Sequence, residues 1–272
     1  MKASITQHAL SCGGSIDSVL QEWLNELDAQ LRNRYGMKRE QTAIGLLDLL
    51  TARVAMVRPD DCQYAASVSK IGILLAYFAI HPNAANNLDP PTRHQLGLMI
   101  KASSNEMASK FSHQLGLKKI QEVLNACGFY DAKEGAGIWV GKHYGEEGER
   151  YGDPLHDHTH AATVRQVLRY FFLLENGQLL SPAASQVMRE IFQSPNIPHD
   201  PIKFVRGLEG RNVEIIRKWG SWEHWLHDAA VIKGEGRNYI LVALTHHSSG
   251  DDYLVDLARK VDDLLLSKAH RQ

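Results

Sequence analysis

The hydrophobic period changes twice along the chain, and this pattern constrains the fold more than any other sequence feature. Residues 42–50 and 52–59 read as the two strands of a hairpin. Three further β-rich runs, "NVEIIRKW", "LHDAAVIKG" and "RNYILVALTH", follow in the last third of the chain, separated by glycine or polar turns. The residues between these two strand regions carry helical patterns instead. We therefore expect the five strands to meet in one antiparallel sheet, with the helical segment inserted between them.

Amphipathic helices are predicted at both ends of the chain. Residues 15–35 place their apolar side chains on one helical stripe, and "DYLVDLARKVDDLLLSK" does the same near the C-terminus. The expected fold class is α/β of the α+β kind, an antiparallel five-stranded sheet flanked by helices with an inserted all-helical lobe. We expect one domain over residues 1–272, with a sheet lobe at about 1–66 and 200–272 and a helical lobe at about 67–199.

Within the helical lobe, residues 67–80 predict a strongly apolar helix that is closed by His81-Pro82. Three short helices follow in "TRHQLGLMIKA", "NEMASKFSHQLG" and "LKKIQEVLNACGF", and helices return at 161–175 and 182–193. The stretch 135–160 is rich in glycine and charged residues, which predicts a long surface loop. Loops of that length inside compact domains often carry function.

Composition and charge exclude several classes of protein. Hydrophobic residues make up 44% of the chain and charged residues 22%, which is typical of a soluble globular protein. The formal net charge of −1 provides no basic surface for nucleic acid, and the longest apolar runs are too short to span a bilayer. No apolar core of a signal peptide precedes Cys12, so the chain as it stands is expected to be cytoplasmic. A form whose export signal had been removed would have the same sequence character and would be periplasmic or secreted.

The stretch "YAASVSK" places Ser67 three residues before Lys70 at the start of the apolar helix. Residues at this spacing lie on the same face of a helix, close enough for a hydrogen bond. A helix N-terminus also favours a developing anion, and a lysine in a dry pocket has a lowered pKa and can act as a base. The alternative is a capping serine followed by an exposed lysine, and the short pattern alone does not separate the two.

Two later motifs favour the catalytic interpretation. Ser103-Ser104-Asn105 follows an apolar helix, and Lys218-Trp219-Gly220-Ser221 lies on a predicted late strand. SxxK, SxN and KxG in this order, on helix, loop and strand, form a signature of serine acyl transfer. Each motif is weak alone, but the ordered set is a strong signal.

The chain therefore resembles the penicillin-recognising serine hydrolases, namely class A β-lactamases and the related DD-peptidases. The resemblance runs from the first helix to the last and implies the fold expected above. It implies that Ser67 is the nucleophile and Lys70 its base or part of a base relay. It also implies that Ser103 shuttles a proton to the leaving nitrogen, and that Lys218 supplies positive charge beside Ser103.

Substrate-binding roles follow from the same resemblance. Asn105 would hold both the substrate amide and the side chain of Lys70. The backbone amides of Ser67 and Ser221 would form the oxyanion hole. Gly220 and Trp219 would lie beside the substrate. No cofactor is implied, and the expected partner is a small-molecule or peptide substrate. The sequence leaves the oligomeric state open.

The chain departs from the family pattern in its motifs. Ser104 stands where the lactamases usually have aspartate, at a position that is mainly structural. Trp219 stands where the family usually has threonine or serine, whose hydroxyl helps to bind a substrate carboxylate. An indole has one N–H donor and far more bulk, which predicts a different or narrower substrate. The alternative is that Trp219 and Trp222 simply pack against the strand.

A third departure concerns deacylation. Class A lactamases use a loop glutamate to activate water, and the corresponding stretch here is "KHYGEEGERYGDPLHDHTHAA". Its acids are Glu146, Glu147, Glu149 and Asp153, and none lies in the expected motif. This favours a peptidase, esterase or amidase, or a slow acyl trap, over an efficient lactamase. A β-lactam- or peptidoglycan-peptide-binding sensor that acylates without turnover is the rival hypothesis.

The histidines near residue 158 raise the possibility of a metal site. The pattern HxHxH, formed by His156, His158 and His160, would suit a metal on a strand. In the resembling family this region is a loop running into a helix, and no CxxC pair accompanies it. The three cysteines are few and widely spaced, so isolated thiols are expected. We expect no metal site, and a metal hydrolase is the third hypothesis.

Overall fold

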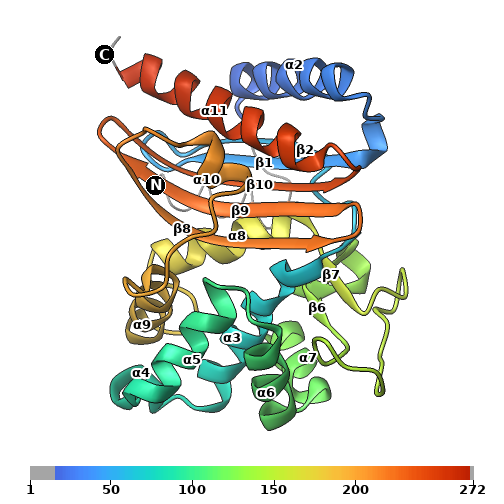
Figure 1. The fold of residues 1–272 in the computed structure, drawn as a ribbon, viewed down its shortest axis with the longest axis vertical. Helices are drawn as coiled ribbons and strands as arrows, with labels where there is room; N and C mark the ends of the chain where they lie inside the picture. Colours follow the sequence, from blue (N-terminus) through green and yellow to red (C-terminus); the bar gives the residue numbers. More distant parts are fainter. Residues whose placement is uncertain (1–15, 270–272) are drawn as a thin grey trace.

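The computed structural model describes residues 16–269, and its centre is the expected five-stranded antiparallel sheet, with strand order β2-β1-β10-β9-β8 (Figure 1). The strands are β1 (Thr42–Asp48), β2 (Arg53–Val57), β8 (Val213–Trp222), β9 (Trp225–Gly234) and β10 (Arg237–His246). The N-terminal hairpin joins the C-terminal strands through the pairing of β1 with β10, in which Leu46 lies opposite Leu241. The sheet therefore closes over an insertion of some 150 residues, as the period of the sequence predicted.

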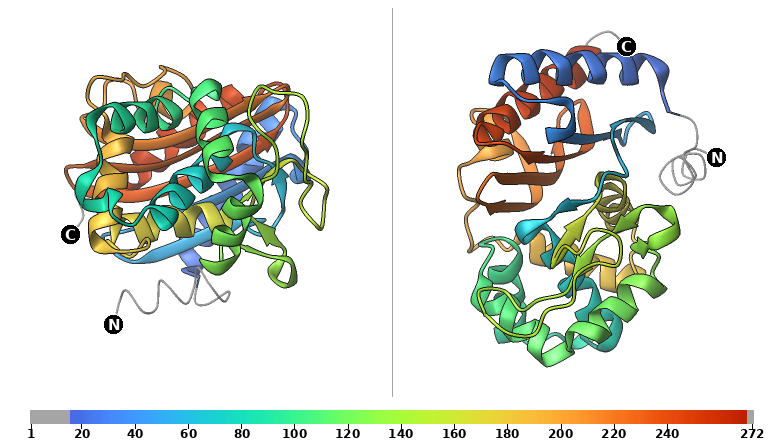
Figure 2. Two further views of the ribbon diagram at one scale, coloured as in Figure 1. Left: turned by 90° about the horizontal axis from the view of Figure 1, so that it is seen from below. Right: turned by 90° about the vertical axis from the view of Figure 1, so that its right-hand side faces the viewer.

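Helices cover both faces of this sheet. α2 (Ser18–Tyr35), α11 (Gly250–Ala269) and the short α10 (Lys203–Gly207) lie on one face. α8 (Val164–Glu175) lies between the other face and the rest of the helices (Figures 1 and 2). The whole of β1 is buried, because both of its faces are covered. Gly45 allows α8 to approach this closely, since a Cβ there would lie 2.7 Å from Cγ1 of Val164.

The remaining helices form the helical lobe around α3 (Lys70–Ile80), which is buried on all sides from Lys70 to Phe78. They are α4 (Ala84–Asn87), α5 (Pro90–Ile100), α6 (Asn105–Leu115), α7 (Leu117–Ala126) and α9 (Pro182–Gln193). A helix that is hydrophobic all round must be enclosed by others, and α5, α6 and α7 enclose α3. The predicted fold class is confirmed, and so is every predicted helix of this lobe.

The prediction of one long surface loop over 135–160 was wrong in part. Two small sheets cross this region: β3 (Gln63–Tyr64), β7 (His160–Ala162) and β6 (Trp139–Val140) form one, and β4 (Tyr130–Asp131) with β5 (Ala136–Gly137) forms the other. Strands of two or three residues are too short to produce a readable alternation. For the same reason the helix predicted from residue 161 begins only at Val164.

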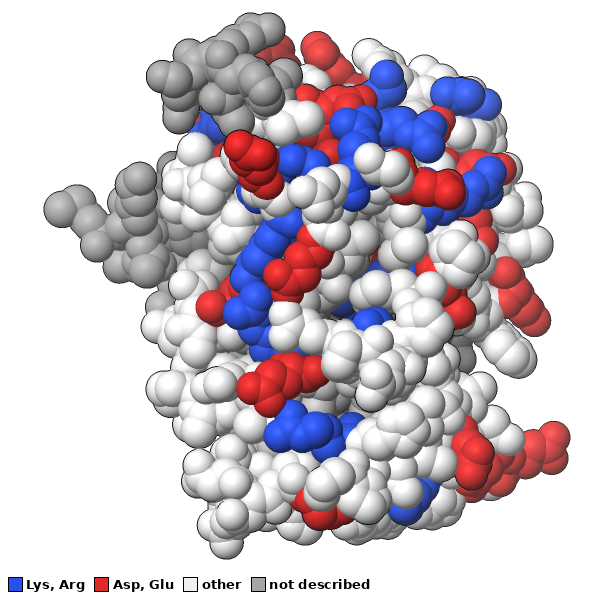
Figure 3. All heavy atoms as spheres, turned by 60° about the vertical axis from the view of Figure 1, so that its left-hand side comes forward, with Lys and Arg blue, Asp and Glu red and all other residues white. Residues whose placement is uncertain are grey.

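Three further observations concern the chain as a whole. Cys62 and Cys127 are free thiols, while Cys12 and the rest of the N-terminal segment lie outside the described residues. No helix within residues 16–269 is long and apolar enough to cross a membrane. On the face drawn in Figure 3, basic and acidic side chains lie side by side, as the net charge near zero suggests.

Candidate active site

Ser67 lies in the short 3₁₀ turn η2 (Ala66–Ser69), which connects β3 to α3. Ala66, the residue before it, has a positive φ of 46°, a backbone conformation that is strained for a residue with a side chain. The turn packs directly against the end of β8. A Cβ on Gly220 would lie 2.9 Å from the backbone nitrogen of Ser67, so only glycine allows β8 to come this close. This packing places the backbone of Ser221 beside that of Ser67.

Lys70 begins α3 and is completely buried. Its Nζ donates to the backbone oxygen of Ser103 at 2.6 Å and to Oδ1 of Asn105 at 2.7 Å, and Oγ of Ser103 lies 3.5 Å away. Burial lowers the pKa of Lys70 to about 7. At neutral pH, a substantial fraction of this amine is therefore unprotonated and able to accept a proton.

The turn between α5 and α6 carries the second motif. Ser103 has a positive φ of 58°, which turns its side chain toward the two lysines. Ser104 caps α6, because its Oγ accepts from the backbone N–H of Met107 at 3.1 Å. Serine and aspartate are both good helix caps, and this explains why Ser104 can stand where relatives carry aspartate.

Lys218 approaches Ser103 from β8. Its Nζ donates to Oγ of Ser103 at 2.8 Å and to the backbone oxygen of Trp219 at 2.6 Å. Burial, and next the charge of Lys70, hold the pKa of Lys218 well below its usual value. Ser103 thus lies between two buried amines, which can pass a proton along one hydrogen-bonded chain. The structure brings the three sequence motifs together in one place.

Trp219, the middle residue of the KxG motif, has surroundings that differ from those expected for a substrate-binding hydroxyl at this position. The Trp219 ring lies 5.2 Å from Nζ of Lys218 and 5.0 Å from Nζ of Lys203, and its Nε1 is buried without a hydrogen-bond partner. Lys203, which the sequence did not indicate, is buried and donates to Oγ of Ser221 at 2.5 Å. No motif surrounds Lys203, so only the packing of α10 against the sheet reveals it.

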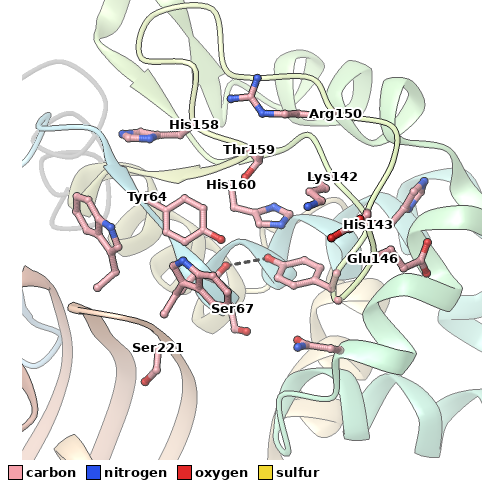
Figure 4. Close-up of a pocket in the computed structure, with 17 residues that line it drawn as sticks. Tyr64, Ser67, Lys142, His143, Glu146, Arg150, His158, Thr159, His160 and Ser221 are labelled. Carbon is pink, nitrogen blue, oxygen red and sulfur yellow. Dashed lines mark hydrogen bonds between the residues drawn. The ribbon is translucent and has the colours of Figure 1, made fainter.

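Ser67 opens into a cavity of about 640 Å³ (Figure 4). Its walls come from η2, the 142–150 loop, β7 and the ends of β8 and β9. Ser221 and Asn105 line it, whereas Ser103, Lys218 and Trp219 lie outside it. The full lining comprises Tyr64, Ala66, Ser67, Asn105, Lys142, His143, Tyr144, Gly145, Glu146, Glu147, Arg150, His158, Thr159, His160, Ser221, Trp222 and Trp225.

Two residues of this wall support the nucleophile turn; the sequence did not indicate Tyr144, and it indicated His160 only as part of the HxHxH pattern. Tyr144 donates its hydroxyl to the backbone oxygen of Ala66 at 2.9 Å and lies 2.7 Å from Oγ of Ser69. The His160 ring stacks on it with ring centres 4.1 Å apart. Burial, together with the charges of Lys70 and Lys142, lowers the pKa of His160 to about 3, so this imidazole is neutral. A spacing pattern cannot reveal such a pair, because stacking depends on the tertiary fold.

Three of the four loop acids form hydrogen bonds with residues other than Ser67. Glu146 accepts from Ser109 and from Nε2 of His113, and Glu149 accepts from Tyr151. Asp153 is buried and accepts from the backbone N–H groups of Leu155, His156 and His158. Glu147 lines the cavity. Within residues 16–269, no carboxylate forms a hydrogen bond with Ser67.

One group of side chains in the described part of the chain has the composition of a metal site. Donor atoms of Cys62, Asp153 and His156 lie within 4.8 Å of one another. The oxygens of Asp153 already accept four hydrogen bonds from three backbone amides and Tyr130, so this carboxylate is used to build the loop. His158 and His160 instead line the cavity beside Ser67. The three histidines of the HxHxH pattern therefore do not converge on one ion.

The pKa of Lys70 predicts the pH dependence of acylation. A lysine base works only as the free amine, so the rate should rise about tenfold per pH unit below pH 7 and level off above it. Stopped-flow acylation by an ester that is stable between pH 5 and 9 measures this profile. A rate that is flat across pH 7 would contradict the assignment of Lys70 as the base.

Comparisons with known proteins agree with this geometry. A protein-family model described as a beta-lactamase enzyme family matches residues 80–268. The solved structures that the chain resembles include an ancestral class A beta-lactamase, with 20% sequence identity, a TM-score of 0.70 and coverage of 90% of this chain and 99% of that one. No curated protein matches the chain.

Two further structures show the same likeness. The beta-lactamase from Sphaerobacter thermophilus has 15% identity and a TM-score of 0.69, over 88% of this chain and 96% of that one. A mutant of PBP-A, in an acyl-enzyme complex with penicillin G, has 16% identity and a TM-score of 0.69, over 90% of this chain and 97% of that one. At these identities, the structures support a common fold.

Proposed function

Because the chain belongs to the beta-lactamase enzyme family, we propose that it is a serine hydrolase that forms an acyl-enzyme on Ser67. The observation that carries this proposal is the hydrogen-bonded chain from Lys70 through Ser103 to Lys218, which lies beside the Ser67 turn. The bond that the protein would hydrolyse is an amide, a β-lactam or a related peptide or ester bond. The PBP-A mutant that is acylated by penicillin G has this fold, which supports the same first step here.

In the proposed mechanism, the free amine of Lys70 takes the proton of Ser67, whose Oγ attacks the substrate carbonyl. The backbone amides of Ser67 and Ser221 stabilise the oxyanion, and donors of this kind contribute roughly 10²–10³ in rate each. The C–N or C–O bond of the tetrahedral intermediate then breaks. Ser103 delivers a proton to the leaving group and recovers one from Lys70. In its protonated form, Lys218 favours this transfer and the binding of an anionic transition state.

Deacylation is the step for which this chain provides the least. Glu146, Glu149 and Asp153 are bonded to Ser109, His113, Tyr151 and backbone amides, Glu147 forms no hydrogen bond with Ser67, and the neutral His160 is a weak base. This observation favours, as a second candidate function, a sensor that is acylated and releases the acyl group slowly. Both candidates share the acylation of Ser67.

Intact-mass spectrometry after incubation with penicillin G or a reactive ester tests the shared step. We expect one adduct per chain in the natural protein and none in the Ser67→Ala variant. Ser18→Ala is the matched control, because Ser18 is an exposed serine at the start of α2, away from Ser67, and its loss should leave labelling in place. Equal labelling of Ser67→Ala and the natural protein would overturn the proposal.

A further inference from the structure

The cavity beside Ser67 is suited to the acyl part of a substrate. Under the proposed function, the leaving group must face Ser103, which protonates it. Ser103 and Lys218 lie outside the cavity, whereas Ser67 and Ser221 lie on its wall. The part of the substrate that stays on Ser67 therefore extends into the cavity, between the 142–150 loop and β7 (Figure 4). The inference below rests on the proposed function in this one respect.

Lys142 is the unneutralised cation of this cavity. Its side chain is half-buried, lines the cavity and points toward the His160 ring (Figure 4). Among residues 16–269 its amine has no hydrogen-bond or ion-pair partner. The other cation of the lining, Arg150, is bound to Asp157 by two hydrogen bonds of 2.8 Å. Lys142 is thus free to bind a group that the protein does not supply.

The acids near Lys142 do not neutralise it. Glu146 is bonded to Ser109 and His113, and neither Glu146 nor Glu147 lies within ion-pair distance of the Lys142 amine. The pKa of His160 is lowered by burial, then by the charge of Lys70 and then by the charge of Lys142. The Lys142 amine therefore lies near enough to act on this ring. This amine has no paired carboxylate among the described residues of this wall.

His160 provides a second, independent indication of a ligand. Its side chain is only 3% exposed, and Nδ1 is buried without a hydrogen-bond partner. An unsatisfied buried polar atom of this kind costs free energy, and a substrate group that bonds to the ring removes that cost. A carboxylate accepts hydrogen bonds from both an ammonium and an imidazole N–H.

We propose that Lys142 and His160 form a subsite for a carboxylate on the acyl part of the substrate. Trp222 and Trp225, with Tyr64, line the same cavity and provide an apolar wall for the chain that connects this carboxylate to the reacting carbonyl. The substrate class is an acyl compound with an anionic side chain, and Lys142 determines this specificity. The anion is thereby bound on the loop side of Ser67, away from Trp219.

Matched esters test the subsite. Mono(4-nitrophenyl) adipate carries a carboxylate on its acyl part, and its methyl ester is the neutral counterpart. In the reaction, Oγ of Ser67 forms a bond to the acyl carbon, Lys70 takes its proton, and 4-nitrophenolate leaves. We expect the natural protein to be acylated about tenfold faster by the carboxylate ester, as one charge-assisted hydrogen bond allows. Lys142→Met should reduce this ratio to about one, and Lys142→Arg should retain it.

Controls separate the subsite from general effects of charge. Lys133→Met removes an exposed lysine elsewhere on the surface and should leave the tenfold ratio unchanged. 4-Acetoxybenzoate carries its carboxylate on the leaving group and should show no dependence on Lys142. A natural protein that reacts equally with both adipate esters, or a Lys142 effect confined to 4-acetoxybenzoate, would overturn the inference.

A binding experiment keeps the inference distinct from the proposed function. Monomethyl adipate, which is not reactive, should bind to Ser67→Ala about tenfold more tightly than dimethyl adipate, and the added Lys142→Met change should remove this difference. If no ester labels Ser67 but this preference is found, the proposed function fails and the subsite stands. Equal binding of the two adipates contradicts the subsite directly.

Discussion

Lys70→Met should slow the acylation of Ser67 by roughly 10²–10⁴-fold, the usual contribution of a general base. Methionine keeps the length of the side chain and its burial in α3, but it cannot accept the proton of Ser67. It also breaks the hydrogen-bonded chain to Ser103 and Asn105. The rate of 4-nitrophenolate release in the pre-steady state measures this loss.

The stability of the same variant identifies the cause of the loss. Because Lys70 is a buried amine, its replacement by an apolar side chain should leave the protein folded, with a cooperative thermal transition. Lys101→Met is the matched control, since Lys101 is also a buried lysine of the helical lobe and bonds to Gln193 and Ser194, away from Ser67. Acylation of Lys70→Met within about threefold of the natural rate would contradict the role of Lys70 as the base.

Asp228→Ala should lower the free energy of unfolding by about 3–5 kcal/mol, the usual cost of breaking a buried ion pair. Asp228 and Arg217 are both completely buried, and Nη2 of Arg217 lies 2.7 Å from Oδ2 of Asp228. The same carboxylate accepts from the backbone N–H of Phe204 at 3.0 Å. The pair thus attaches α10 to the strands β8 and β9, next to the lysine of the KxG motif.

Urea denaturation of Asp228→Ala measures this cost, and Glu190→Ala is the control. Glu190 pairs with Arg93 on the surface, where both side chains are exposed, so its loss should change the unfolding free energy by no more than about 1 kcal/mol. We also expect acylation of Asp228→Ala to be reduced, because Lys218 follows Arg217 directly in β8. Similar unfolding free energies for the two variants would show that the buried pair does not hold this edge of the sheet.

The sheet and the helical lobe could be predicted because their elements are long and strongly patterned. A ten-residue strand such as β10 or an apolar helix such as α3 has a period that is visible in the sequence alone. The 135–160 region could not be predicted in the same way. Its order depends on strands of two residues and on the hydrogen bonds that Asp153 accepts, and these contacts form only when distant segments come together.

The residues of the candidate site also differ in whether the sequence predicts them. Ser67, Lys70, Ser103 and Lys218 lie in spaced motifs, and the structure brings the three motifs into one hydrogen-bonded group. Tyr144 and Lys203 belong to no motif, and His160 lies in the HxHxH pattern, which suggested a metal site instead. Their roles depend on ring stacking, on burial and, for His160, on an unpaired ring nitrogen. These are properties of the folded chain. The proposed carboxylate subsite therefore consists of residues that no catalytic motif of the sequence marks.

Under the proposed function, Ser67 accepts an acyl group, which this site removes slowly. Intact-mass spectrometry over time, after excess penicillin G has been removed, measures both parts, and peptide mapping locates the adduct. We predict one adduct on the peptide that contains Ser67. We predict that it persists for many minutes, because no carboxylate within residues 16–269 forms a hydrogen bond with Ser67. An adduct on any other residue, no adduct at all, or complete release within seconds would contradict this mechanism.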